Sequence, residues 1–257
     1  MHLIDSHAHL DMLDHLPLAL DHAAEAGVVQ IVTIGVDLKS SQAAVDLAGR
    51  HAHVFATVGL HPHDAEQADA AFWAGFEALA RSGRPVAIGE CGLDFYRDLS
   101  PRPAQREAFA RQVELAKSLK LPLVIHDRDA HAETAAMLTD LDAGQVGGVL
   151  HCFSGGADLA RAVLDLGFYL GITGVITYKN AEPLREVARQ TPLERLVIET
   201  DCPFLTPEPH RGRPNQPAYV AHTCAGLAKA LGRPAEEVAE ATTANARRLF
   251  GLPGGED

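Results

Sequence analysis

The chain alternates between short apolar runs and longer amphipathic segments over almost its whole length. The apolar runs are typical of strands that are buried on both faces. The segments between them repeat apolar residues at helical spacing, and Gly or Pro marks most transitions. The pattern predicts strands over 3–7, 28–36, 54–60, 85–91, 121–126, 147–153, 168–174 and 195–201. Helices are predicted over 16–27, 38–50, 71–83, 103–120, 129–142, 157–167, 181–190, 221–231 and 234–250.

Strands that alternate with helices pair in parallel, and eight of them predict an α/β protein with a closed (β/α)8 TIM barrel. The usual length of such a barrel, about 250 residues, suits this chain of 257 residues. The rival is an open doubly wound sheet, which typically carries a Gly-rich phosphate loop after its first strand. Neither G-x-G-x-x-G nor a Walker A pattern occurs. Without a long linker to divide the chain, one domain over residues 1–257 is expected.

Composition narrows the classes of function. The formal net charge of −12 argues against a broad basic surface that grips duplex nucleic acid. No apolar run approaches the length of a membrane-spanning helix, so we expect a soluble protein. The four cysteines show no C-x-x-C spacing and no signal peptide precedes them, which favours a reduced, cytoplasmic location. No protein partner is predicted.

Polar side chains close most of the predicted strands. An i, i+2 pair at a strand end directs both side chains to one side, and the C-terminal ends of barrel strands carry the chemistry in TIM barrels. Each such residue alone is as compatible with a hydrogen-bonded core position as with a ligand. Together they would repel or lie unsatisfied unless a cation joined them. The set that we predict to bind metal comprises His7, His9, Glu90, His126, His151 and Asp201.

Six ligands exceed what one tetrahedral zinc site uses, so two divalent ions are expected. Glu90 is the candidate to bridge them, because its carboxylate has two oxygens. His7, His9 and Asp201 would complete one site, since the first and eighth strands are neighbours in a closed barrel. His126 and His151 would belong to the other. Imidazole favours zinc or manganese over magnesium, and the identity of the ions stays open among Zn, Mn and Mg.

Several longer motifs resemble the TatD family of metal-dependent deoxyribonucleases. They are DSHAHLD, GLHPHDA, GECGLDF, VIHDRDA, HCFSG, ETDCPFLTP, RGRPNQP and TTANARRLFGL, and they span nearly the whole chain. The resemblance implies a TIM barrel of the amidohydrolase superfamily with a two-metal site that hydrolyses DNA, often from the 3′ end. The family's ligands fall on the six residues already named. Gln216 departs from the pattern, since many members carry an acid there.

Further residues are assigned roles as hypotheses. Asp201 is the candidate general base for a water activated by two metals, and Glu90 and His61 complete the catalytic set. His61 would contact the scissile phosphate or support the site, while His63 is placed in a loop. Tyr96 and Phe95 could stack on a base or pack in the core. The candidate substrate-binding residues are Arg97, Arg128, Arg211, Tyr96 and Ser154.

The expected substrate is a DNA 3′ end, single-stranded or frayed, with RNA possible. A metal barrel polarises carbonyl groups as readily as phosphoryl groups, so a hydrolase of esters or amides, such as an aminoacyl-tRNA deacylase, is the alternative. A metal-holding protein without catalysis is a third reading. We interpret Cys91, Cys152 and Cys202 as small buried apolar residues, and Asp94 as a residue that supports the site.

Overall fold

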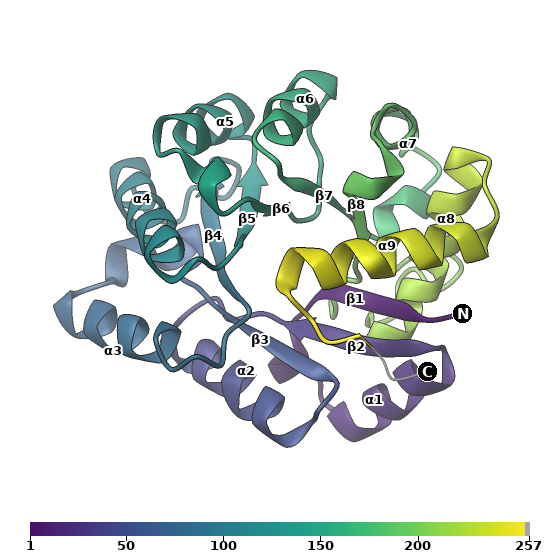
Figure 1. The fold of residues 1–257 in the computed structure, drawn as a ribbon, viewed down its shortest axis with the longest axis horizontal. Helices are drawn as coiled ribbons and strands as arrows, with labels where there is room; N and C mark the ends of the chain where they lie inside the picture. The colour runs from purple at the N-terminus through teal and green to yellow at the C-terminus, as the bar shows by residue number, and fades with distance from the viewer. Residues whose placement is uncertain (255–257) are drawn as a thin grey trace.

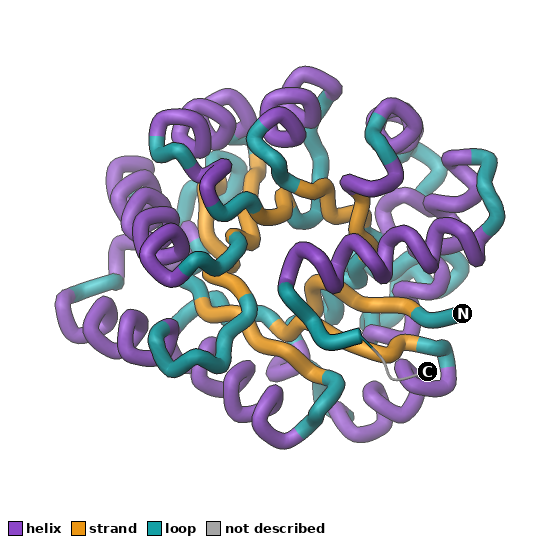
Figure 2. Tube along the Cα trace, viewed as in Figure 1, coloured by secondary structure: helices purple, strands orange, loops and turns teal. Residues whose placement is uncertain are grey.

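Within residues 1–254, which the computed structural model describes, eight parallel strands form one sheet in chain order. A bridge between Ala8 and Cys202 joins the first strand to the chain just after the eighth, so the sheet closes into a barrel. Helices surround this ring of strands (Figures 1 and 2). The predicted (β/α)8 barrel is therefore confirmed. The strands are β1 (Leu3–Ala8), β2 (Val28–Thr33), β3 (Val54–Val58), β4 (Ala87–Asp94), β5 (Leu123–Arg128), β6 (Gly148–Leu150), β7 (Tyr169–Ile172) and β8 (Leu196–Ile198).

The helices begin and end close to the predicted positions. Asp37 accepts a hydrogen bond from the Ser40 backbone at 2.6 Å and so caps the second helix. Gly251, whose φ of +63° lies in the left-handed region, ends the last helix. The helices are α1 (Leu16–Glu25), α2 (Leu38–Arg50), α3 (Ala70–Ala80), α4 (Arg102–Leu119), α5 (His131–Asp140), α6 (Ala157–Asp165), α7 (Glu182–Gln190), α8 (Val220–Leu231) and α9 (Ala235–Phe250). Short 3-10 segments that the pattern did not predict include η1 (Leu10–Met12), η2 (Pro62–Gln67) and η5 (Leu193–Arg195).

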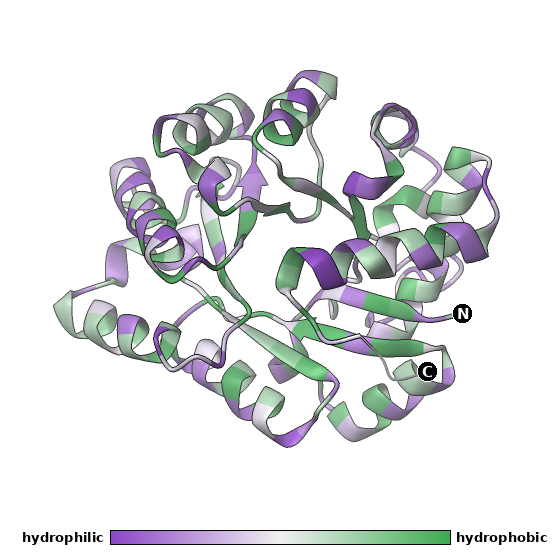
Figure 3. Ribbon diagram, viewed as in Figure 1, coloured by the Kyte–Doolittle hydropathy of each residue, from purple (hydrophilic) through white to green (hydrophobic). Residues whose placement is uncertain are grey.

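The strands separate two apolar cores. One lies between strands and helices, and the other joins the barrel interior to the C-terminal end of α9, including Leu249 and Phe250. The colouring by hydropathy shows mostly apolar strands and helices of mixed character (Figure 3). Asn245 of α9 donates to the carbonyl of Leu196 at 2.8 Å, and Thr243 donates to that of His2 at 3.0 Å. Helix α9 therefore covers the end of the barrel where the strands begin (Figure 1).

Two of the strands that lead to the predicted site end earlier than predicted. β6 and β8 stop at Leu150 and Ile198, so His151 and Asp201 lie beyond them. Cys152 and Asp201 adopt positive φ, +45° and +57°, because the chain turns out of the sheet there. Strand alternation does not extend to Cys152, and the interpretation of this residue as a buried apolar one is wrong, since it is partly exposed.

Two glycines permit the irregular backbone of β4. Gly89 and Gly92 have φ of +140° and +144°, and the register against β5 shifts between Ile88 and Cys91. A Cβ at Gly92 would overlap the carbonyl oxygen of His126 on the neighbouring strand. The close approach of β4 to β5 therefore requires glycine at this position.

Among the described residues, no helix has the length and apolar character needed to span a bilayer.

Replacing Gly92 with Ala is expected to destabilise the fold by at least about 2 kcal/mol, because the new Cβ is strained and overlaps β5. Gly49→Ala provides the matched control, since Gly49 is exposed within α2 and has room for a Cβ. That substitution should stabilise the protein by about 0.5–1 kcal/mol through helix propensity. Urea unfolding followed by circular dichroism measures both, and equal stability of the two variants would contradict the account of β4.

Candidate metal centre

The carboxylate of Glu90 lies at the centre of a cluster of imidazoles at the end of the barrel where the strands finish. Its Oε1 is 2.8 Å from His126 Nδ1 and 2.9 Å from His151 Nε2. Its Oε2 is 3.4 Å from His7 Nε2 and 3.8 Å from His9 Nε2. One oxygen therefore faces β5 and β6, and the other faces the end of β1.

Asp201 completes the side of the cluster formed by β1. Its Oδ1 lies 3.6 Å from His7 Nε2 and 3.4 Å from His9 Nε2. Ligand atoms of these three residues all lie within 4.8 Å of one another. The same holds for two further groups that share Glu90, one with His7 and His151 and one with His61 and His126. The structure thus brings together the six residues predicted to bind metal and adds His61 to them.

The donor atoms of this cluster suit a cation. His7 is fully buried, and neither of its ring nitrogens has a hydrogen-bond partner among residues 1–254. The Nδ1 atoms of His9 and His151 are also buried without one. Buried imidazole nitrogens cost free energy unless they bind a proton donor, an acceptor or a metal. Together with two carboxylates they form a set that fits zinc, manganese or similar divalent ions.

The carboxylate of Glu90 is held in its charged form. Burial by itself would raise its pKa, but the charge of His151 and hydrogen bonds from His126 and His151 lower that pKa well below the usual range. Burial, followed by the neighbouring His151, lowers the pKa of His7. Burial by itself would lower the pKa values of His9, His126 and His151, but the carboxylates of Asp201, Asp94 and Glu90 raise them. A metal bound there would therefore displace protons from these three rings.

His61 differs from the other imidazoles of the cluster in how its ring is oriented. Its Nδ1 accepts a hydrogen bond from the backbone N–H of His63 at 3.2 Å. Burial, followed by the charge of His126, lowers the pKa of His61 strongly, so the ring is neutral. A neutral ring that accepts at Nδ1 carries its proton on Nε2, which lies 3.5 Å from Glu90. His61 is thus a hydrogen-bond donor toward the cluster, despite its proximity to the predicted ligands.

Asp94, the last residue of β4, connects β5 and η2 beside the cluster. Its carboxylate lies 3.1 Å from His126 Nε2 and 2.8 Å from His63 Nε2, and it accepts from the backbone N–H of Arg97 at 2.7 Å. Burial opposes its ionisation, but the hydrogen bond from His126 and the others lower the pKa of Asp94. His63 lies in η2 and not in a structureless loop, so the sequence interpretation missed its contact with this site.

Two buried acids near the cluster were also missed. Glu199 accepts from the backbone N–H of Cys152 at 2.5 Å and lies 3.6 Å from His151 Nδ1. Asp5 accepts from the backbone N–H of Thr200 at 2.8 Å and from its hydroxyl at 2.6 Å, and burial raises the pKa of Asp5 to about 8. Asp5 lies two positions before His7 in β1, so the i, i+2 rule applied backwards would have found it. Glu199 follows the end of β8, where strand alternation no longer applies.

The candidate substrate-binding residues lie around the same end of the barrel. Arg128, the last residue of β5, places its guanidinium 4.1 Å from the centre of the Tyr96 ring. Tyr96 is 60% exposed and so is not a core residue, whereas the neighbouring Phe95 is partly buried against the core. Arg211 lies in the same way over Tyr178, at 4.1 Å. Arg97 and Ser154 are exposed, after β4 and β6 respectively.

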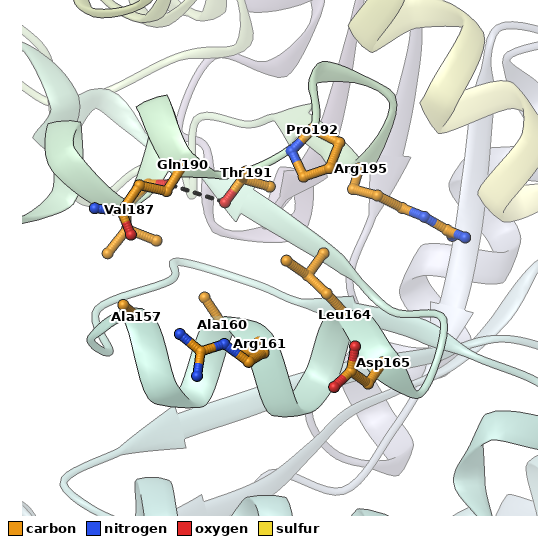
Figure 4. Close-up of a pocket in the computed structure, with 10 residues that line it drawn as sticks. All are labelled: Ala157, Ala160, Arg161, Leu164, Asp165, Val187, Gln190, Thr191, Pro192 and Arg195. Atoms are coloured by element: carbon orange, nitrogen blue, oxygen red, sulfur yellow. Dashed lines mark hydrogen bonds between the residues drawn. The ribbon is translucent and has the colours of Figure 1, made fainter.

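A groove of about 350 Å³ lies on the outside of the barrel between α6 and the C-terminal part of α7 with the segment that follows it (Figure 4). Arg161 and Asp165 line one wall, and Gln190, Thr191 and Arg195 line the other. None of the described residues that line it was predicted for the site. The cluster around Glu90 is therefore the candidate functional site.

Comparisons with known proteins find similar chains over almost the whole length. The family model for TatD related DNase matches residues 4–251. An uncharacterized metal-dependent hydrolase of Bacillus subtilis, YabD, is 40% identical over 251 residues, which cover 96% of this chain and 98% of that protein. The 3′-5′ ssDNA/RNA exonuclease TatD of Citrobacter koseri is 41% identical over 236 residues, 90% of each. The crystal structure of YJJV, a TatD homologue from Escherichia coli k12, superposes with a TM-score of 0.92 at 32% identity and covers 98% of both chains.

Glu90→Gln is expected to weaken binding of divalent metal by at least about 10- to 100-fold, because the substitution removes the central charge while keeping the shape. Metal content after dialysis against buffered manganese or zinc, measured by mass spectrometry, gives the result. Glu240→Gln is the control, since Glu240 is exposed on α9. Unchanged metal content in the Glu90 variant would rule out a central role for this carboxylate.

Proposed function

This chain belongs to the family of TatD related DNases, and from that premise we propose that it is a metal-dependent 3′-5′ exonuclease acting on single-stranded or frayed DNA ends. The observation that carries the proposal is the cluster in which the carboxylate of Glu90 lies between two sets of imidazoles. The name of the Citrobacter koseri relative, a 3′-5′ ssDNA/RNA exonuclease, supports the choice of substrate. RNA ends are included as possible substrates for the same reason.

Two divalent cations would be held by the six predicted ligands. His7, His9 and Asp201 form one group of donors, and Glu90 offers a second oxygen toward His126 and His151. Bound there, the cations would supply Lewis acidity to a phosphoryl group and to the attacking water. Imidazole-rich coordination favours zinc or manganese, and magnesium would be accepted through the carboxylates.

Asp201 acts as the general base. Its Oδ1 faces His7 and His9, which leaves Oδ2 to take the proton from the attacking water. The positive φ of Asp201 and the hydrogen bond from its backbone N–H to the His7 carbonyl, 2.9 Å, fix this carboxylate against β1. Proton transfer depends on such positioning, because the base must lie within hydrogen-bond reach of the water.

His61 donates a hydrogen bond to the scissile phosphate from Nε2. Its orientation supports this role, because the backbone N–H of His63 occupies Nδ1 and keeps the proton on the other nitrogen. Arg97, Arg128 and Arg211 stand around the mouth, where guanidinium groups bind phosphates of the incoming strand. Ser154 adds a hydroxyl at the same rim.

The charge of the chain limits how much nucleic acid it holds. With a formal net charge of −12, the protein engages a few nucleotides at one strand end and does not wrap a duplex. The small number of arginines at the mouth gives the same expectation. Removal of nucleotides from an end fits such a surface better than sequence-specific cutting.

Asp201→Asn should lower turnover by at least about 100-fold while metal content changes less than about threefold, since the amide oxygen can still coordinate but cannot take a proton. Steady-state cleavage of end-labelled single-stranded DNA, together with metal analysis, separates the two effects. Asp158→Asn, at an exposed position on α6, is the control. A variant with wild-type turnover would exclude Asp201 as the base.

The purified protein should shorten single-stranded DNA from the 3′ end in manganese and stop when a chelator is added, because the active groups include the cations. The same preparation is tested on duplex DNA, RNA and an aminoacyl ester. Activity on the ester with none on any oligonucleotide would overturn the proposal in favour of an ester hydrolase.

A further inference from the structure

Most of the large exposed apolar side chains lie in segments that follow strands, at the end of the barrel that carries the candidate metal centre. Within the described chain, six large hydrophobic residues are exposed, and four of them lie in loops that follow β1, β4 or β8. Isolated exposed apolar residues are ordinary on protein surfaces, so exposure alone indicates no site. What indicates a site is that four of these residues lie at the mouth of the barrel. The four are Met12, Tyr96, Leu99 and Phe204.

Phe204 is an aromatic member of this set, and its ring lies beside that of a predicted ligand. Its ring centre lies 5.9 Å from that of His9 with an angle of 73° between the planes, so the contact is edge-to-face. Phe204 remains 51% exposed. Tyr96 differs, because the guanidinium of Arg128 already lies over its ring. Phe204 therefore offers an aromatic surface that is open to a ligand of the centre.

The loop that carries Phe204 is held rigidly. Its backbone N–H donates to the carbonyl of Asp201 at 2.8 Å. Asn215, which is 1% exposed, donates to the carbonyls of Thr200 at 2.8 Å and Phe204 at 2.6 Å, and its own N–H donates to Pro203 at 3.1 Å. The asparagine of the RGRPNQP motif thus fixes the turn that follows Asp201.

A fixed aromatic ring beside a metal centre is suited to stacking. Single-strand binding proteins use exposed aromatic rings on which successive bases stack, with each stacked base contributing about 1–3 kcal/mol. A ring that is already fixed loses little conformational entropy when the base arrives. An unpaired base offers both of its faces to an aromatic ring, whereas a base inside a duplex has both faces covered by its neighbours and a terminal base pair exposes only one.

We propose that Phe204 is the stacking platform for one of the two nucleobases that flank the scissile phosphodiester, and that it makes cleavage depend on a base at that nucleotide. The proposal rests on the proposed exonuclease function and adds the part of the substrate that is recognised. Specificity for single strands then arises from this stacking as well as from the charge of the protein. Asn215 is the residue that positions the platform.

The test compares base removal with ring removal. Oligonucleotides of one sequence carry an abasic tetrahydrofuran residue at the 3′-terminal or at the penultimate nucleotide. For the wild type, one of these replacements should lower kcat/KM by roughly 5- to 100-fold. In Phe204→Ala the same replacement should have less than about a twofold effect, since the base has lost its partner.

Conservative variants identify stacking as the cause. Phe204→Trp should keep the dependence on the base, whereas Phe204→Leu, which keeps bulk but not the aromatic ring, should lose most of it. Leu18→Ala is the matched control, because Leu18 is 53% exposed and lies on α1. If Phe204 acted only by packing against His9, its removal would lower metal content and the cleavage of both oligonucleotides equally, and that result would overturn the proposal.

A binding measurement separates this proposal from the proposed function. The fluorescence of 2-aminopurine placed at either nucleotide should be quenched when the strand binds Asp201→Asn protein in manganese, and not when Phe204→Ala is added to that variant. Equal cleavage of base-bearing and abasic strands by the wild type would reject the platform and leave the exonuclease standing. Failure to cleave any oligonucleotide would reject the exonuclease, and the quenching would then decide on the platform alone.

Discussion

The carboxylate of Glu90 lies between 2.8 and 3.8 Å from five imidazoles. Two of them belong to β1 and β5, and the other three follow the ends of β1, β3 and β6. An ionised acid in a buried position is stable only when donors or cations surround it. The imidazoles supply the donors, and the pKa of Glu90 falls well below the usual range despite the opposing effect of burial. Much of the architecture around the mouth serves to bring these rings to one carboxylate.

The two ends of the barrel have different roles: one is closed by a helix, and the other carries the cluster. Helix α9 covers the end where the strands begin, and Leu249 and Phe250 join the apolar interior there. The opposite end is left to polar side chains, which project from the ends of strands and from the turns that follow them. Because the strands are fixed on all sides by pairing and packing, the turns beyond them are held in place.

Buried acids outside the cluster hold the predicted ligands, or the residues next to them, in place. Asp94 holds His126, Glu199 lies beside His151, and Asp5 joins β1 to the residue before Asp201. Such outer contacts orient metal-binding side chains and select which ring nitrogen is free. Asn215 does the same for the turn that carries Phe204. The site thus depends on a second layer of contacts whose members are far apart in the sequence.

Local pattern in the sequence determined the fold and most of the cluster. Apolar periodicity identifies every strand, and the polar residues that close the strands include the six predicted ligands, because a closed barrel brings all strand ends to one rim. The prediction failed where the chain leaves the sheet: β6 and β8 are short, Cys152 is partly exposed, and His63 contacts Asp94. The tertiary structure alone decided which oxygen of Glu90 faces which ring, which nitrogen of His61 carries the proton, and that Asp5 bonds Thr200 across 195 residues of chain. These features depend on contacts between residues distant in sequence, and periodicity carries no information about them.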